Sequence, residues 1–182
     1  MRPVKRSVIA TLLLIISISG CAHEKIVLAP ASDRTTLVPY GVHRQSVTVA
    51  IKKVPTDPKA AAQTPKTMNF SGVMDHRAER TQLIGLTPFG STLFRLVDDP
   101  KTKTLTFTTD NDQMKKAEPY LKATYAPIRE MLKVPYPPVT REVTKGDFKF
   151  RFEDFNAQEM PMKILIFTPD FDLTIKEEGY EP

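Results

Sequence analysis

The chain has 182 residues, of which 41% are hydrophobic, and a formal net charge of +5 at pH 7. It has one cysteine and no tryptophan, so no intrachain disulfide can form and aliphatic side chains, phenylalanine and methionine must supply the core. Three of the 26 basic side chains lie within the first six residues and the rest of the chain carries only +2, so its charge gives no reason to expect nucleic-acid binding.

The first 20 residues have the pattern of a secretory signal peptide. Three basic residues precede a mostly apolar run from Val8 to Ile18, and small residues follow it. The run has roughly half of the about 20 apolar residues that a membrane-spanning helix needs. The motif Ile18-Ser19-Gly20-Cys21 at its end resembles the lipobox of bacterial lipoproteins. The resemblance implies that residues 1–20 are removed and that Cys21 is lipidated; a secreted protein with an unmodified Cys21 is the alternative.

The same resemblance bears on where the mature protein is located. In bacterial lipoproteins the common signal for retention in the inner membrane is an aspartate after the cysteine, whereas this chain has Ala22. We therefore expect a protein anchored in the outer membrane, on its periplasmic face, where acyl chains on Cys21 give effectively permanent attachment. Residues 21–45 are interrupted by two prolines and a glycine and are expected to form a tether with at most a short strand. Residues 46–182 are then one domain of ordinary size.

Alternating apolar and polar residues predict strands along most of that domain. The clearest case is Phe148, Phe150 and Phe152, which share one face of a strand while charged residues share the other. The expected strands are Val47–Ile51, Met68–Met74, Leu83–Leu86, Ser91–Val97, Leu105–Phe107, Phe148–Phe152, Ile164–Phe167 and Phe171–Ile175. Short turns separate most consecutive strands, which indicates antiparallel pairing.

One segment between the fifth and sixth expected strands has helical periodicity. Leu121, Tyr125, Ile128 and Leu132 fall on one stripe of a 3.6-residue helix. Pro127 predicts a break near residue 126, because proline lacks the N–H group and disfavours helical backbone in the residue before it. The fold class is therefore α+β: a curved antiparallel sheet of about eight strands, covered by one broken helical segment. Such a short cover leaves two options, a sheet that curls onto itself or an apolar face that stays open to a ligand.

No pattern of catalytic or metal-binding residues is evident. The three histidines, His23, His43 and His76, have no metal-ligand spacing, and we interpret them as solvated surface residues. Asp170 and Asp172 could form a carboxylate pair, but the alternation of their strand favours the solvent side for both. We therefore expect no enzyme, no cofactor and no metal; a hydrolase that uses one of these residues is the weakest alternative.

The segment from Leu83 to Leu96, with the sequence LIGLTPFGSTLFRL, resembles the strand–turn–strand core of LolB-type outer-membrane lipoprotein receptors. It is more similar still to a family of uncharacterised bacterial lipoproteins allied to the LolA/LolB lipoprotein localisation factors. The resemblance implies a half-barrel whose helical cover closes an apolar cavity for acyl chains. The connection from Asp75 to Gln82 departs from the family, because it is polar where LolB-type receptors present an exposed apolar residue to the membrane.

Two functions remain open from the sequence. In the first, the protein binds lipid or acyl chains in an apolar concavity, as a carrier or acceptor held at the membrane by Cys21. The expected lining is Phe70, Phe94, Leu96, Phe150 and Phe152, with Leu121 and Ile128 from the helix. In the second, it is a structural or accessory lipoprotein that docks on a cell-envelope complex, with a filled core and no ligand.

Overall fold

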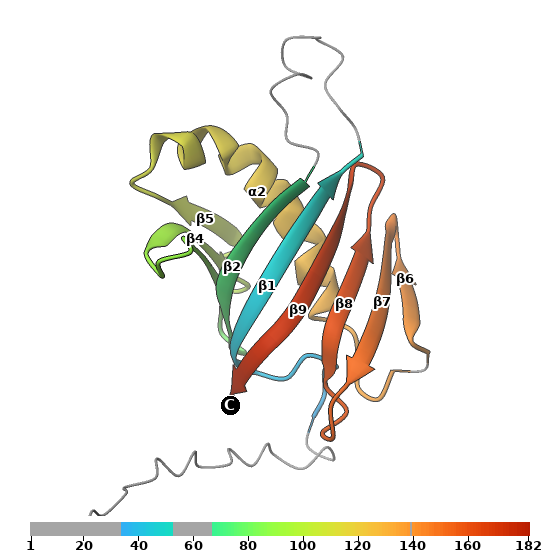
Figure 1. Ribbon diagram of the computed structural model, residues 1–182. Helices are drawn as coiled ribbons and strands as arrows, with labels where there is room; N and C mark the ends of the chain where they lie inside the picture. Colours follow the sequence, from blue (N-terminus) through green and yellow to red (C-terminus); the bar gives the residue numbers. More distant parts are fainter. Residues whose placement is uncertain (1–33, 53–66, 139) are drawn as a thin grey trace, which may run out of the picture.

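The structure is a computed structural model that describes residues 34–52, 67–138 and 140–182. The expected signal peptide and Cys21 lie outside the described residues. Within them the chain forms a single antiparallel sheet of nine strands and one helix, α2. Figure 1 shows how the sheet and the helix are arranged. The strands are β1 (Gly41–Ile51), β2 (Thr67–His76), β3 (Thr81–Leu86), β4 (Thr92–Asp99), β5 (Thr104–Thr108), β6 (Glu142–Lys145), β7 (Phe148–Phe155), β8 (Pro161–Phe167) and β9 (Phe171–Glu181), and α2 spans Asp112–Met131.

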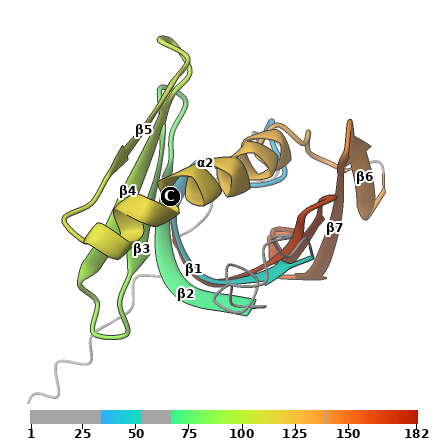
Figure 2. The same ribbon diagram turned by 90° about the horizontal axis from the view of Figure 1, so that it is seen from above.

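The order of strands in the sheet is β5-β4-β3-β2-β1-β9-β8-β7-β6, so the first and last strands of the described residues pair at its centre. All neighbouring strands are antiparallel, as predicted. The sheet is open and strongly curved, and α2 lies across its concave side (Figure 2). The predicted α+β class, with a curved antiparallel sheet and a helical cover, is therefore confirmed.

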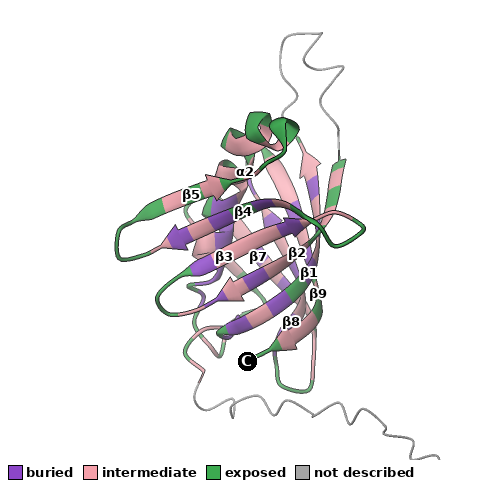
Figure 3. Cartoon of the chain, turned by 90° about the vertical axis from the view of Figure 1, so that its left-hand side faces the viewer, coloured by how far each residue is buried: buried purple, intermediate pink, exposed green. Residues whose placement is uncertain are grey.

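The burial of side chains follows the predicted alternation. On β7, Phe150 and Phe152 are fully buried, while the alternating residues Lys149 and Arg151 are only half-buried on the other face. Figure 3 shows the same alternation of buried and less buried positions along β4. The apolar side chains on the concave face of the sheet are buried by α2 and by one another. Their removal from water supplies the main favourable free energy of folding.

The expected count of eight strands was one too few, because β6 was missed. Its sequence, Glu142–Lys145, has a single apolar residue and gives no alternating signal. It forms because Gly146, with φ of 56°, makes a tight turn to β7. Glu142 then pairs across the two strands with Lys149 and Arg151.

The first strand begins at Gly41, six residues before its expected start at Val47. Its additional inward positions are His43 and Gln45, which are polar and therefore concealed the alternation, yet both are buried. The interpretation of His43 and His76 as surface residues was wrong, since they are 0% and 7% exposed. His43 is stabilised by hydrogen-bond contacts of its two ring nitrogens with Glu177 and the Pro39 carbonyl.

The segment before β1 also contributes to the core. Leu37 and Val38 are buried, and the Leu37 N–H donates to the Val134 carbonyl at 2.8 Å. This contact joins the segment to the chain that leaves α2. Part of the range expected to be a tether thus packs against the domain.

The predicted break in the helix near residue 126 was wrong, because α2 is continuous through both Pro119 and Pro127. Asn111 caps its start, accepting from the backbone N–H groups of the second and third residues that follow. A proline inside a helix costs about 3 kcal/mol, but Pro127 is itself buried, and burial of this part of α2 against the sheet offsets that cost. The helix changes direction along its length, as Figure 1 shows.

Candidate functional site

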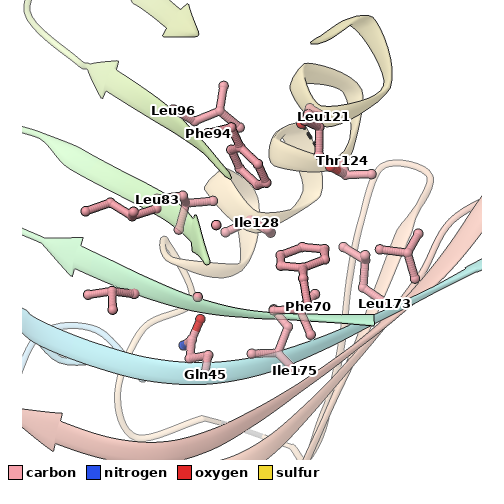
Figure 4. A pocket seen from close by; sticks show the side chains of 16 residues that line it. Gln45, Phe70, Leu83, Phe94, Leu96, Leu121, Thr124, Ile128, Leu173 and Ile175 are labelled. Carbon is pink, nitrogen blue, oxygen red and sulfur yellow. Dashed lines mark hydrogen bonds between the residues drawn. The ribbon is translucent and has the colours of Figure 1, made fainter. Parts of the chain in front are cut away.

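An apolar pocket lies between the concave face of the sheet and α2 (Figure 4). Its walls come from five neighbouring strands, β1–β4 and β9, and its cover comes from the helix. The cavity has a volume of about 40 Å³. The residues that line it are Gln45, Val47, Val49, Phe70, Gly72, Val73, Leu83, Ile84, Gly85, Phe94, Leu96, Leu121, Thr124, Ile128, Leu173 and Ile175.

Five of the seven side chains expected to line a cavity lie together around this pocket. These are Phe70, Phe94 and Leu96 from the sheet, and Leu121 and Ile128 from α2. The other two, Phe150 and Phe152, do not line it. They lie on β7, separated from β9 by β8, and are fully buried in the core. The sequence showed which face of β7 points inward but not how far along the curved sheet the pocket extends.

The ring of Phe94 occupies space that a glycine on the neighbouring strand leaves free. Gly85 pairs with Phe94 across β3 and β4, and a Cβ atom at Gly85 would overlap the Phe94 ring. Without that atom the ring lies across β3, where its centroid is 5.9 Å from that of Phe70 and 6.0 Å from that of Phe107. Gly85 belongs to the segment that carries the resemblance, so one residue of that segment has a direct packing role.

The two halves of α2 are held to the sheet to different degrees. All four of its buried residues, Tyr125, Pro127, Ile128 and Met131, lie in the last seven positions. None of the thirteen residues from Asp112 to Thr124 is buried, and Figure 3 shows the first turns largely exposed. The part of the helix that covers the pocket at Leu121 is therefore the weakly packed part.

A buried polar network joins the C-terminal part of α2 to the C-terminal end of β4. Asp98, whose side chain is 11% exposed, accepts from Arg129 through both carboxylate oxygens, at 2.8 and 2.6 Å. The Tyr125 hydroxyl donates to the same carboxylate at 3.0 Å. Burial, together with the negative charge of Asp98, raises the pKa of Tyr125 well above its usual value. The hydroxyl therefore stays protonated and remains a donor.

A second buried polar cluster joins the central strands at one end of the pocket. Glu177 on β9 contacts Nδ1 of His43 at 3.1 Å and accepts from Gln45 at 3.2 Å. Gln45 also lines the pocket, so a polar side chain of the sheet faces a largely apolar surface. Sequence reasoning missed these residues, although continuing the alternation of Val47 and Val49 toward the N-terminus would have placed Gln45 and His43 on the inner face.

The described residues show no helix long and apolar enough to span a membrane. In the same ranges no three histidine, cysteine, aspartate or glutamate side chains are grouped so that they could hold a metal ion. No protein-family model matches the chain, and no curated protein matches it. The similarity to LolB-type lipoproteins therefore stays a prediction from the segment Leu83–Leu96.

Proposed function

We propose that the protein binds lipid or acyl chains between the concave face of its sheet and α2, as a carrier or acceptor anchored to the outer membrane through Cys21. The observation that carries this proposal is the apolar pocket beneath the weakly packed half of α2. Ligand sites of this kind are concave and mostly apolar, with few polar groups. The curved open sheet with one helix across it suits the half-barrel that the sequence resemblance implies.

Binding of a long chain requires the pocket to enlarge. Its volume of about 40 Å³ is far below the roughly 300–1,000 Å³ of ordinary ligand sites. The half of α2 from Asp112 to Thr124 is the element that can move, because it buries no residue of its own. Its displacement would uncover partly buried apolar side chains of β2 and β5, including Phe70 and Phe107.

The affinity of such a site would come from apolar contact. Each Å² of apolar surface removed from water contributes about 25 cal/mol before ordering costs, so a chain laid along β2–β5 could bind in the micromolar range. Contacts of this kind give little specificity for one chain over another. The protein would then distinguish ligands mainly by their polar ends.

The second candidate is a structural or accessory lipoprotein with a filled core, and the small volume of the pocket is the observation that favours it. In that case the protein works through its surface, by docking on a cell-envelope complex. The two candidates differ in one measurable property, which is saturable binding of an apolar ligand inside the domain.

The test uses a domain that starts at Ala22, delipidated, and titrated with an uncharged fluorescent fatty-acid ester. Saturable micromolar binding is expected. Leu96→Trp should weaken it at least tenfold, because the larger ring fills the cavity. Val97→Trp places the same ring on the opposite face of β4 and is the matched control, with the melting temperature of each variant confirming that it folds. Absence of saturable binding in the folded wild-type domain would leave the accessory role in its place.

A further inference from the structure

A second and larger hollow, here called the basic groove, lies where β2, β3 and β4 meet the C-terminal half of α2. Its volume is about 600 Å³. The acidic side chain in its lining is Asp98, whereas five are basic: Arg77, Arg80, Lys103, Arg129 and Lys133. A concave surface with this excess of positive charge favours an anionic ligand.

The basic side chains of the groove differ in how strongly they are paired with acidic residues of the protein. Arg129 is held by both oxygens of Asp98 and belongs to the fold. Arg80 is 53% exposed, and the nitrogen in its ion pair lies 3.6 Å from Asp75. Lys103 makes no ion pair with any residue that the structure describes, and its φ of 55° is one that most residues avoid. Exposed ion pairs contribute little free energy, so Arg80 and Lys103 can turn to a ligand at small cost.

A buried histidine nitrogen without a partner points to a ligand in the basic groove. His76 lines the groove, is 7% exposed, and places Nδ1 3.0 Å from the Thr81 hydroxyl. Its other ring nitrogen, Nε2, has no hydrogen-bond partner in the part of the chain that the structure describes. A buried polar atom left unpaired destabilises the fold, and a bound ligand that pairs with it would remove that cost. Burial lowers the pKa of His76 to about 4, so the ring is neutral. In the tautomer in which Thr81 donates to Nδ1, Nε2 carries the proton and can donate to an oxyanion.

The basic groove and the apolar pocket are consecutive along the same face of the sheet. On β3, Thr81 lines the groove and Leu83 lines the pocket; on β4 the corresponding residues are Asp98 and Leu96. Each pair is two residues apart, which places both members on one face about 7 Å apart along the strand. A single amphiphile could therefore occupy both sites.

We propose that the basic groove binds a phosphate group, and that it takes the head of an amphiphile whose chain lies in the apolar pocket. Guanidinium and ammonium groups at its rim suit phosphate oxygens, and the Nε2 donor of His76 adds a directed contact. The chain half of this proposal rests on the function proposed above, whereas the phosphate half does not. Free phosphate compounds share the chemistry of such a head, so the test compares the two sources.

The test is calorimetric titration of the full-length chain in a nonionic detergent, with protein-free micelles as the blank. The probes are inorganic pyrophosphate, dihexanoyl phosphatidic acid and dihexanoylglycerol, which has the chains but no phosphate. The variant Arg80→Gln/Lys103→Gln removes two charges from the groove. Lys101→Gln/Lys116→Gln removes the same charge from exposed positions outside its lining and is the matched control.

The expected result is saturable binding of both phosphate probes, at least tenfold weaker in the groove variant and unchanged in the control. An affinity for phosphatidic acid at least tenfold above that for pyrophosphate would identify a lipid head, and equal affinities would identify a soluble phosphate compound. No saturable phosphate binding, or equal loss in both double variants, would overturn the proposal. If the groove does not bind phosphate, the uncharged ester should still bind in the apolar pocket. Failure of the groove proposal can therefore be distinguished from failure of the proposed function.

Discussion

Single inward-facing residues decide what the concave face of the sheet can hold. Gly85 supplies space rather than contact, since its missing side chain lets the Phe94 ring lie across β3. Gln45 and Glu177 do the opposite and place buried polar side chains at one end of a largely apolar surface. The concave face is therefore divided into an apolar region and a polar end by a few positions along each strand.

The buried neutral state of His76 predicts how stability depends on pH. In the unfolded chain His76 takes up a proton near pH 6.5, whereas in the fold burial lowers its pKa to about 4. The unfolded state thus binds more protons between these values, and the free energy of unfolding falls as the pH drops from 6.5 toward 4. Protonation of His76 would contribute a loss of about 3 kcal/mol over this window.

Denaturant unfolding at several pH values measures this dependence. Carboxylates also titrate in this range, so the contribution of His76 is the difference between the wild type and His76→Gln. The variant should show a flatter profile between pH 6.5 and 4, while the two profiles run parallel above pH 7. Parallel profiles over the whole range would show that His76 is not held neutral in the fold.

At the scale of elements, the strands could be predicted wherever alternation and turn residues agreed. β7 is such a case, with Phe148, Phe150 and Phe152 on one face. β6 could not be predicted, because its pairing depends on the turn at Gly146 and on charges across the strands. The start of β1 was hidden because its inward residues His43 and Gln45 are polar, and their shared partner Glu177 lies 134 and 132 residues away in the sequence.

The helix was predicted at the right place in the chain, but its continuity was not predicted. Pro127 disfavours helix locally, and contacts with the sheet outweigh it. Membership of the pocket could be predicted for Leu121 and Ile128 from their stripe on α2. The strands that Leu121 and Ile128 face could not be predicted, because the curvature of the sheet is a property of the whole fold.

The attachment of α2 predicts the effect of removing one carboxylate. Asp98→Asn neutralises the group that accepts from Arg129 and Tyr125, and leaves a partly buried guanidinium without its counter-charge. Breaking a buried ion pair costs 3–5 kcal/mol, and because Arg129 is 39% exposed we expect about 2 kcal/mol here. Chemical denaturation measures this value. Glu118→Gln removes an exposed pair with Lys122 from the same helix and should cost under about 1 kcal/mol. Equal costs would mean that the Asp98 network does not fasten α2.

At the scale of the whole molecule, the two ends of the described chain meet in the middle of the sheet. β1 pairs with β9, and the segment before β1 packs beside the exit of α2. Twelve residues lie between Cys21 and Arg34, where the described chain begins, so these two residues can be at most about 45 Å apart. A lipid on Cys21 would thus hold the pocket and the groove within a short distance of the membrane, which raises the effective concentration of membrane lipids at both sites.

The anchor itself is the prediction on which this arrangement depends. Cys21→Ser should leave the precursor uncleaved and abolish incorporation of labelled palmitate, because the lipobox resemblance makes the thiol the point of attachment. Metabolic labelling followed by membrane fractionation measures both effects. Ala22→Asp is the matched control: it keeps the cysteine, should label as well as the wild type, and should move the protein from the outer to the inner membrane. Undiminished labelling of Cys21→Ser would rule out a lipid on this residue, and the pocket and groove would then have to act without a fixed membrane.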